Sequence, residues 1–302
     1  MMPQMSGDAY VGRFAPSPTG PLHRGSVIAA LASFLDARAA GGTWRLRIDD
    51  VDRGRARDDA AADILRALEV LGLHWDGPVQ YQDPRRDQYQ EALERLRERQ
   101  RAYPCGCTRR EIAAVAPIGP AGMIYPGTCR NGLPAGRHAR SWRFAMAPGE
   151  LSFSDRHAGR QSVEAATGIG DFIIRRGDGL HAYHLAMVVD DAALGVTDVV
   201  RGGDLRPATF PQLALQQSLG LPTPRYLHLP IAVGSDGRKL SKTNGAPPVD
   251  LTHPGAALID ALAFLGQAPD AEMAGAPARE VLEWAVANWR PALIPRSSEW
   301  QV

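Results

Sequence analysis

The chain has 302 residues, and its content of 44% hydrophobic and 22% charged residues is typical of a folded globular protein and excludes long disordered segments. A formal net charge of +1 gives no basic field over the whole surface, which argues against binding to nucleic acid by charge alone but leaves a local patch open. The first ten residues lack the apolar stretch of a signal peptide, and no run approaches the roughly 20 apolar residues that span a bilayer. We therefore expect a cytoplasmic monomer with no membrane partner.

Strands and helices alternate through the first hundred residues, which predicts a parallel α/β sheet. Residues 10–15 form a short strand pattern, and the apolar residues of 27–35 recur at helical spacing. Residues 44–48 alternate apolar residues with arginine, as a strand does, and the helix that follows ends at Gly72. Residues 85–103 predict a charged amphipathic helix.

The alternation of strands and helices breaks at Pro104. A stretch rich in Cys, Gly and Pro runs from there to about residue 134, and short strand patterns follow at 141–145 and 151–153. We interpret this part of the chain as an insertion into the sheet.

The second half of the sheet is expected after the insertion. The apolar run 171–174 leads back to it, 184–189 and 196–200 have the composition of buried strands, and 207–219 predicts a helix. Two closing helices are predicted at 254–265 and 279–289. The expected organisation is a first half of the core (1–103), an inserted subdomain (104–170), a second half of the core (171–245) and a C-terminal helical region (246–302).

One segment has the composition of a phosphate-binding turn. Residues 13–26 read RFAPSPTGPLHRGS and run from a strand into a helix start. Unpaired amides and the positive end of the helix dipole favour an anion there. His23 can donate to a phosphate oxygen, and Gly25 lets a flat base approach the backbone. The same letters fit an ordinary turn with a helix cap, so the segment alone does not identify a nucleotide site.

A second segment is unusual because it contains lysine. Of the 34 basic residues 32 are arginine, and the only lysines are Lys239 and Lys242 in the run GRKLSK. An ammonium is a compact point charge that a guanidinium does not replace. Two of them on a closing loop can stabilise the charge on departing pyrophosphate. A solvated surface turn is the alternative, but the two segments in this order are more specific than either alone.

Together these segments resemble the two signatures of class I aminoacyl-tRNA synthetases, at 23–26 and 238–242, although Arg24 and Ser26 differ from the usual letters. The runs GRFAPSPTGPLHRGS, RIDD and YHLAMVVDDAALGVTDVVRG resemble the glutamyl-tRNA synthetase family along nearly the whole chain, and most closely its shortened branch, which acts on queuosine in tRNA(Asp). The resemblance implies a class I Rossmann-type parallel sheet with an inserted zinc-containing subdomain and a short C-terminal helical region. It implies an enzyme of the ligase type that uses ATP as a substrate, together with Mg.

The resemblance also carries over functional residues. The implied catalytic residues are His23, Gly25, Lys239 and Lys242, and the implied ATP-binding residues are Pro16, His23, Gly25, Ser26 and Lys242. The implied L-glutamate-binding residues are Arg13, Phe14, Ala15, Pro16, Ser17, Asp49, Tyr183 and Arg201. Physical chemistry agrees with this assignment. The guanidinium of Arg13 or Arg201 can bind a carboxylate of glutamate through two N–H groups, while Asp49 pairs with the ammonium of glutamate. The family usually has Glu at this last position, so Asp49 either acts through water or shares the role with Asp50.

The insertion carries all three cysteines of the chain, Cys105, Cys107 and Cys129. Two cysteines one residue apart are poorly placed for a disulfide but can chelate one ion, and the third supplies another corner of a tetrahedral zinc site. The resemblance implies structural zinc with Tyr125 as the fourth ligand. His138 is the alternative fourth ligand, and buried thiols without a metal are the alternative to the site.

About 60 residues follow Lys242, too few for a large anticodon-binding domain. The resemblance therefore implies activation of glutamate and its transfer to queuosine in the anticodon of tRNA(Asp), with that tRNA as partner. Three alternatives stay open: a minimal synthetase that charges the tRNA 3′ end, a non-catalytic RNA-binding paralogue, and a generic nucleotidyltransferase.

Overall fold

The computed structural model of the protein describes residues 9–54, 56–119, 122–233, 247–296 and 299–301. Its strands are β1 (Val11–Phe14), β2 (Thr43–Ile48), β3 (Gln80–Tyr81), β4 (Ala102–Cys105), β5 (Ile118–Gly119), β6 (Gly122–Met123), β7 (Ser141–Phe144), β8 (Glu150–Asp155), β9 (Gly159–Glu164), β10 (Phe172–Arg175), β11 (Asp198–Gly202), β12 (Arg225–Leu229), β13 (Ile231–Val233) and β14 (Glu299–Gln301). Its helices are α1 (Arg24–Ala39), α2 (Asp58–Val70), α3 (Arg86–Glu98), α4 (Arg109–Ala113), α5 (Ala165–Gly168), α6 (Tyr183–Ala193), α7 (Thr209–Leu219), α8 (Pro254–Phe264) and α9 (Ala278–Asn288). Short 3₁₀ turns are η1 (Asp83–Arg85), η2 (Gly203–Leu205), η4 (Ala271–Met273) and η5 (Pro291–Leu293).

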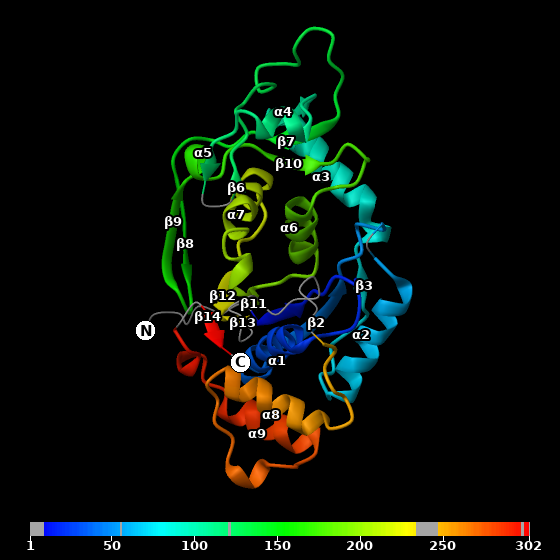
Figure 1. The fold of residues 1–302 in the computed structure, drawn as a ribbon, viewed down its shortest axis with the longest axis vertical. Coiled ribbons are helices and arrows are strands. Elements are labelled where there is room, and N and C mark those ends of the chain that lie inside the picture. The colour runs from blue at the N-terminus through cyan, green and yellow to red at the C-terminus, as the bar shows by residue number, and fades with distance from the viewer. Residues whose placement is uncertain (1–8, 55, 120–121, 234–246, 297–298, 302) are drawn as a thin grey trace, which may run out of the picture.

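Parallel strands form the centre of the molecule (Figure 1). β1 pairs with β2 and β2 with β3, while β11 pairs with β12, all in parallel. β11 lies beside β1, where the Thr197 amide donates to the Val11 carbonyl at 3.0 Å. β12 also meets β8 of the long antiparallel hairpin β8–β9, which reaches back from the insertion to the sheet. The predicted parallel α/β sheet is confirmed.

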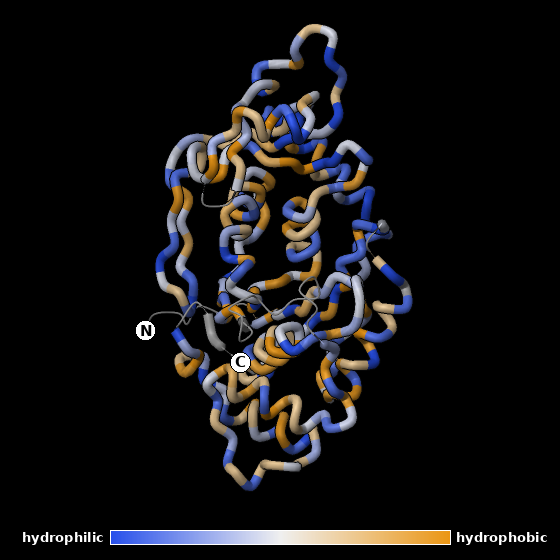
Figure 2. The backbone as a smooth tube through the Cα atoms, viewed as in Figure 1, coloured by the Kyte–Doolittle hydropathy of each residue, from blue (hydrophilic) through white to orange (hydrophobic). Residues whose placement is uncertain are grey.

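α1 is buried on nearly every side because it lies between the sheet and the helix pair α8–α9 (Figure 1). Its sequence is rich in alanine, the best helix former, and its leucine, isoleucine and phenylalanine side chains fill the largest apolar cluster. Figure 2 shows apolar residues gathered where these helices meet. The two closing helices predicted from sequence are confirmed as α8 and α9, and they pack against α1.

A separate small sheet lies at the end of the molecule opposite α8 and α9, formed by β7 of the insertion with β4 and β10 at the borders of the insertion (Figure 1). β7 pairs in antiparallel register with both β4 and β10. Behind this sheet, α3, α6 and α7 share a second apolar cluster that includes Phe144 and Leu185. The predicted strands at 141–145 and 151–153 are confirmed as β7 and part of β8.

Two predicted elements differ from the structure. Residues 184–189, predicted as a strand, belong to helix α6, because the helix continues through Asp190 and Asp191, whose carboxylates are buried as ion-pair partners. A short apolar run has no periodicity that separates the two structures. The predicted helix 85–103 ends at Glu98, where Gln100 takes a φ of 55° and the Arg101 amide donates to the Leu96 carbonyl at 2.7 Å. Within the described residues, no helix is long and apolar enough to cross a bilayer.

Candidate active site

A cavity of about 360 Å³ opens where β1, β11 and β12 end and α1 begins. The carboxyl ends of parallel strands are where open α/β sheets bind ligands. The cavity is lined by Phe14, Pro16, Ser17, Thr19, His23, Gly25, Ser26, Ile28, Ala29, Gly202, Asp204, Leu205, Leu229, Pro230, Ile231 and Phe264. It thus combines apolar walls with a helix start, which suits a nucleotide whose base is flat and whose phosphates are anionic. Four residues predicted to bind ATP, Pro16, His23, Gly25 and Ser26, lie in its wall.

His23 caps the start of α1. Its Nδ1 accepts from the Ser26 amide at 3.3 Å, and its carbonyl accepts from the same amide at 2.9 Å. Because Nδ1 acts as an acceptor in this cap, the ring proton of neutral His23 belongs on Nε2. The cap therefore fixes a tautomer with an N–H donor of the kind that a phosphate oxygen accepts.

The flanks of the second signature are joined to the first one. Pro248 forms an isolated bridge with His23, and the Val249 amide donates to the Leu22 carbonyl at 3.0 Å. On the other side, β13 begins at Ile231, a residue of the cavity wall. The predicted catalytic residues Lys239 and Lys242 lie outside the described residues.

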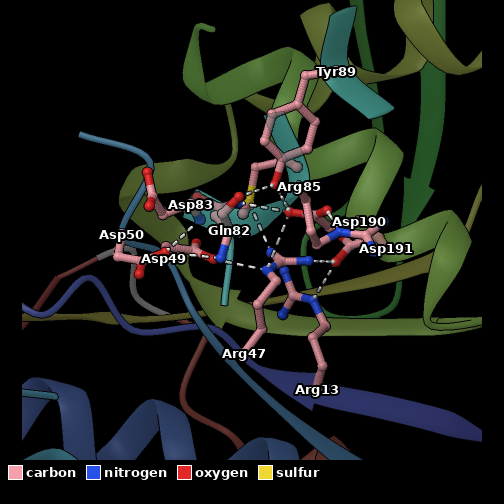
Figure 3. A network of polar contacts seen from close by, with 11 residues as sticks. Arg13, Arg47, Asp49, Asp50, Gln82, Asp83, Arg85, Tyr89, Asp190 and Asp191 are labelled. Atoms are coloured by element: carbon pink, nitrogen blue, oxygen red, sulfur yellow. Dashed lines mark hydrogen bonds and ion pairs between the residues drawn. The ribbon is translucent and has the colours of Figure 1, made fainter. Parts of the chain in front are cut away.

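A buried network of opposite charges lies next to the cavity (Figure 3). Arg47, which is fully buried, donates to Asp49 and to Asp191, each at 2.7 Å. Asp191 also pairs with Arg13 at 3.4 Å. The strands β1 and β2 and the helix α6 thus bring predicted residues Arg13 and Asp49 together around Asp191.

The two carboxylates bonded to Arg47 differ in their affinity for protons. Burial raises the pKa of Asp49 to about 7, although the Arg47 guanidinium acts in the opposite direction. Burial acts on Asp191 in the same way, but the charges of Arg13 and Arg47 outweigh it and hold the pKa of that carboxyl below its ordinary value. Of these two carboxylates, the surrounding arginines favour the anionic form of Asp191, whereas an added cation would stabilise the anionic form of Asp49.

Asp190, the neighbour of Asp191, anchors α6 to the preceding elements (Figure 3). It accepts from Gln82 at 2.9 Å, from Arg85 at 2.6 Å and from Tyr89 at 2.7 Å. Asp50 has a similar structural task, since one of its oxygens accepts the backbone amides of Gln82 and Asp83 at 2.8 and 2.9 Å. These bonds engage one oxygen of Asp50 in holding η1.

Arg201 enters the same region from β11. It is buried, its Nε donates to His228 at 3.1 Å, and its Nη2 donates to Thr209 at 2.8 Å. The charges of Arg13, Arg47 and Arg201 all lower the pKa of Asp191. Burial, together with the charge of Arg201, lowers the pKa of His184 to about 4.

Five predicted glutamate-binding residues remain to be located. Tyr183, at the first turn of α6, is 38% exposed, and its ring contacts that of His184 edge to face. Phe14, Pro16 and Ser17 lie in the cavity wall, and Ala15, between them, is half-buried.

The three cysteines converge in the insertion. Their sulfur atoms all lie within 4.8 Å of one another, and Cys107 and Cys129 are 3.7 Å apart. The Tyr125 hydroxyl is 3.4 Å from both Cys105 and Cys107. Burial raises the pKa of Cys105, but hydrogen bonds from Tyr125 and Arg143 lower it overall, to about 7. His138 is exposed and does not join this group.

These separations fit a tetrahedral zinc ion. With Zn–S bonds of about 2.3 Å and a Zn–O bond of about 2.0 Å, tetrahedral geometry puts sulfurs about 3.8 Å apart and sulfur and oxygen about 3.5 Å apart. Three thiols and one phenol oxygen around one point are the donor set that the sequence predicts.

Several residues of the site were not singled out from the sequence. Arg47, Asp190 and Asp191 lie in the runs RIDD and VVDD, where their charge inside apolar strings was a usable signal. Thr209 and His228 had no such signal, because only the fold brings them to Arg201.

Comparison with known proteins agrees with this geometry. Residues 10–119 and 129–273 match the family model of the catalytic domain of class I tRNA synthetases (E and Q). The parallel sheet, with a cavity at the start of α1, is consistent with this class of catalytic domain. Curated relatives include the Glutamyl-Q tRNA(Asp) synthetases of Aromatoleum aromaticum, 53% identical over 95% of this chain and 91% of its own length, and of Chromobacterium violaceum, 50% identical over 96% and 97%. The chain belongs to this family of glutamyl-Q tRNA(Asp) synthetases.

Solved structures show the same fold. A glutamate tRNA ligase from Elizabethkingia meningosepticum, in complex with its amino acid, superimposes with a TM-score of 0.79 at 25% identity. The match covers 96% of this chain and 66% of that one. A glutamate-tRNA synthetase from Elizabethkingia anophelis has the same score and identity.

Proposed function

We propose that the protein activates L-glutamate with ATP and transfers the glutamyl group to queuosine in the anticodon of tRNA(Asp). One observation carries the proposal: the nucleotide-sized cavity directly adjoins buried charges of both signs. Phe14 and Gly202 line the cavity, and Arg13 and Arg201 precede them in the chain. Glutamate has two carboxylates and one ammonium, so two arginines and Asp49 complement it.

In the activation step, a carboxylate oxygen of glutamate attacks the α-phosphorus of ATP, and the bond to the β-phosphate breaks. Pyrophosphate leaves, and its growing charge is met by the start of α1, by His23 and by Lys239 and Lys242. Mg bound with ATP would neutralise part of the same charge. In the transfer step, a hydroxyl of the queuosine cyclopentene diol attacks the activated carbonyl carbon, the bond to the AMP phosphate oxygen breaks, and AMP leaves while the hydroxyl proton passes to the departing phosphate or to water. The side chains of Arg13, Asp49 and Arg201, together with Tyr183, hold glutamate in line with the phosphate.

We infer that Cys105, Cys107, Tyr125 and Cys129 hold one structural zinc ion. When bound, the metal would cross-link β4 to the loop before β7. In this proposal the catalytic unit comprises 1–103 and 171–245, the zinc lies in 104–170, and 246–302 supports α1. The protein acts as a monomer in the cytoplasm, where ATP and tRNA are supplied.

The RNA substrate is supported by the names of the relatives, which match this chain over nearly their whole length. The test is transfer of labelled glutamate to an isolated anticodon stem-loop of tRNA(Asp), with and without queuosine. We expect label only on the queuosine-containing stem-loop. Label on the 3′ end of a full-length tRNA, and none on the stem-loop, would instead identify a minimal charging enzyme.

A further inference from the structure

A chain of buried polar side chains lies behind Arg201. His228 receives the Arg201 Nε–H at 3.1 Å, and its Nδ1 lies 2.6 Å from an oxygen of Asp155. Thr209 receives a second N–H of Arg201 at 2.8 Å. All four residues are at most 5% exposed. The chain therefore links β11 to α7, β12 and the end of β8.

The donors and acceptors in this chain fix the state of His228. Asp155 Oδ1 accepts the backbone amides of His157 and Ala158 at 2.9 and 2.8 Å, and Oδ2 accepts the His228 amide at 3.2 Å. Burial raises the pKa of Asp155, but hydrogen bonds from His228 and the backbone lower it overall, so the carboxylate is an anion that can only accept from Nδ1. Nδ1 therefore carries the proton, and Nε2 presents a lone pair to Arg201. Burial and the charge of Arg201 also lower the pKa of His228 to about 4, which keeps the ring neutral. The Tyr226 ring, stacked at 5.9 Å and 8°, restrains the imidazole plane.

Arg201 is held differently from the other buried arginines of the site. Arg13 and Arg47 are bonded to Asp191, which offsets their charge. Within the described part of the chain, the side-chain partners of Arg201 are an imidazole, a hydroxyl and the face of Tyr226, and none of them is an anion in contact. These neutral acceptors fix the direction of the guanidinium but leave its positive charge available for a ligand.

We propose that Asp155 and His228 are positioning residues that aim the Arg201 guanidinium at a carboxylate of the bound amino acid, an inference that rests on the proposed role of Arg201. Asp155 sets the tautomer of His228, and the lone pair on Nε2 orients Arg201. Neither residue touches the substrate. The pair therefore acts on the affinity for glutamate and not on ATP.

Two substitutions of His228 distinguish a role in positioning Arg201 from a role in packing alone. In His228→Gln the side-chain oxygen can occupy the place of Nε2 and still accept from Arg201, whereas in His228→Asn the shorter amide imitates Nδ1 and reaches only Asp155. Glutamate-dependent ATP–pyrophosphate exchange gives KM for each substrate. We expect the KM for glutamate to rise about tenfold to a hundredfold in His228→Asn and clearly less in His228→Gln, with the KM for ATP unchanged in both.

A double-mutant cycle completes the test. If His228 acts through Arg201, His228→Asn adds little to the effect of Arg201→Ala on the glutamate KM. Equal effects of Asn and Gln, or full additivity with Arg201→Ala, would overturn the inference. If His228→Asn does not fold, Asp155→Asn takes its place. The asparagine side chain has only one acceptor oxygen, so its NH₂ group must face either the backbone amides of His157 and Ala158 or the Nδ1–H of His228, which are all donors. Absence of glutamate-dependent exchange in the wild type would refute the proposed function itself. Exchange that occurs without these differences in the glutamate KM among the variants would refute only the positioning role.

Discussion

In the proposed site, Asp49 is the residue whose protonation would link pH to glutamate binding. Its folded-state pKa of about 7 lies above the ordinary value, because burial penalises the charged form. The substrate ammonium needs the carboxylate, which is fully present above that pKa and lost as the pH falls through it. We therefore expect the KM for glutamate to rise as the pH is lowered from 8 to 6, measured by pyrophosphate exchange.

Asp49→Asn provides the control for this pH effect. The amide cannot ionise, so the variant should have a glutamate KM that is about a hundredfold higher and nearly independent of pH over the same range. Asp49→Glu restores the carboxylate usual in the family and should keep or improve activity. A pH profile that is unchanged in Asp49→Asn would show that another group titrates.

Lys242 is expected to matter most in the transition state. Charge on pyrophosphate grows as the α-phosphorus is attacked, so a preorganised cation lowers the barrier more than it strengthens ATP binding. Lys242→Ala should reduce the exchange rate about 10²- to 10³-fold with a modest change in the KM for ATP. Lys242→Arg should restore little of the lost rate, since a planar guanidinium does not replace a compact ammonium. Full activity of the alanine variant would make this run an ordinary surface turn.

At the scale of single elements, the proposed zinc site of the insertion depends on three thiol sulfurs and one phenol oxygen. Cys105→Ser should lose zinc, because a hydroxyl replaces a thiolate in a site with three sulfurs, and mass spectrometry of the native protein measures the loss. Tyr125→Phe removes only the phenol oxygen, so loss of zinc there supports the tyrosine as fourth ligand. Zinc that stays in Tyr125→Phe would point to water or His138 instead.

The elements also mark where sequence patterns stop being informative. α1 was predictable because its apolar residues recur at helical spacing, and α7 because Pro207 precedes it and Gly220, whose φ of 67° favours glycine, ends it. α6 was not predictable as a helix, because its apolar run has no polar face. The aspartates that extend it are satisfied by arginines and a tyrosine from distant parts of the chain, at distances that no local pattern reports.

At the scale of the whole molecule, the C-terminal helices support the site through α1. Leu258 of α8 is completely buried in the cluster that α1 shares with the sheet. Leu258→Ala should lower the free energy of unfolding by about 2–5 kcal/mol, because it removes buried methyl groups and leaves a cavity. Denaturant unfolding measures this, and Leu293→Ala, at a residue that is 52% exposed, is the matched control. Equal effects of the two variants would contradict a supporting role for α8.

Only part of the candidate site was predictable, as with the fold, because sequence patterns report contiguous residues and not contacts between distant elements. The signature at the start of α1 lies on contiguous residues, so the sequence predicts His23 and Gly25 together. The orientation of Arg201 depends on Asp155, Thr209 and His228, which come from three separate elements. Such a group exists only after the insertion hairpin β8–β9 has returned to the sheet.

The described flanks of residues 234–246 are anchored beside the cavity, by β13 on one side and by the Val249–Leu22 hydrogen bond on the other. In the proposed mechanism, the length of chain between these two anchors sets the effective concentration of the Lys239 and Lys242 ammonium groups at the pyrophosphate. Doubling the span with Gly and Ser would cost only about 0.6 kcal/mol of stability. The same change dilutes the tethered charges about threefold, by the −3/2 power of length. A series of insertions should therefore slow glutamate activation step by step while the melting temperature hardly moves.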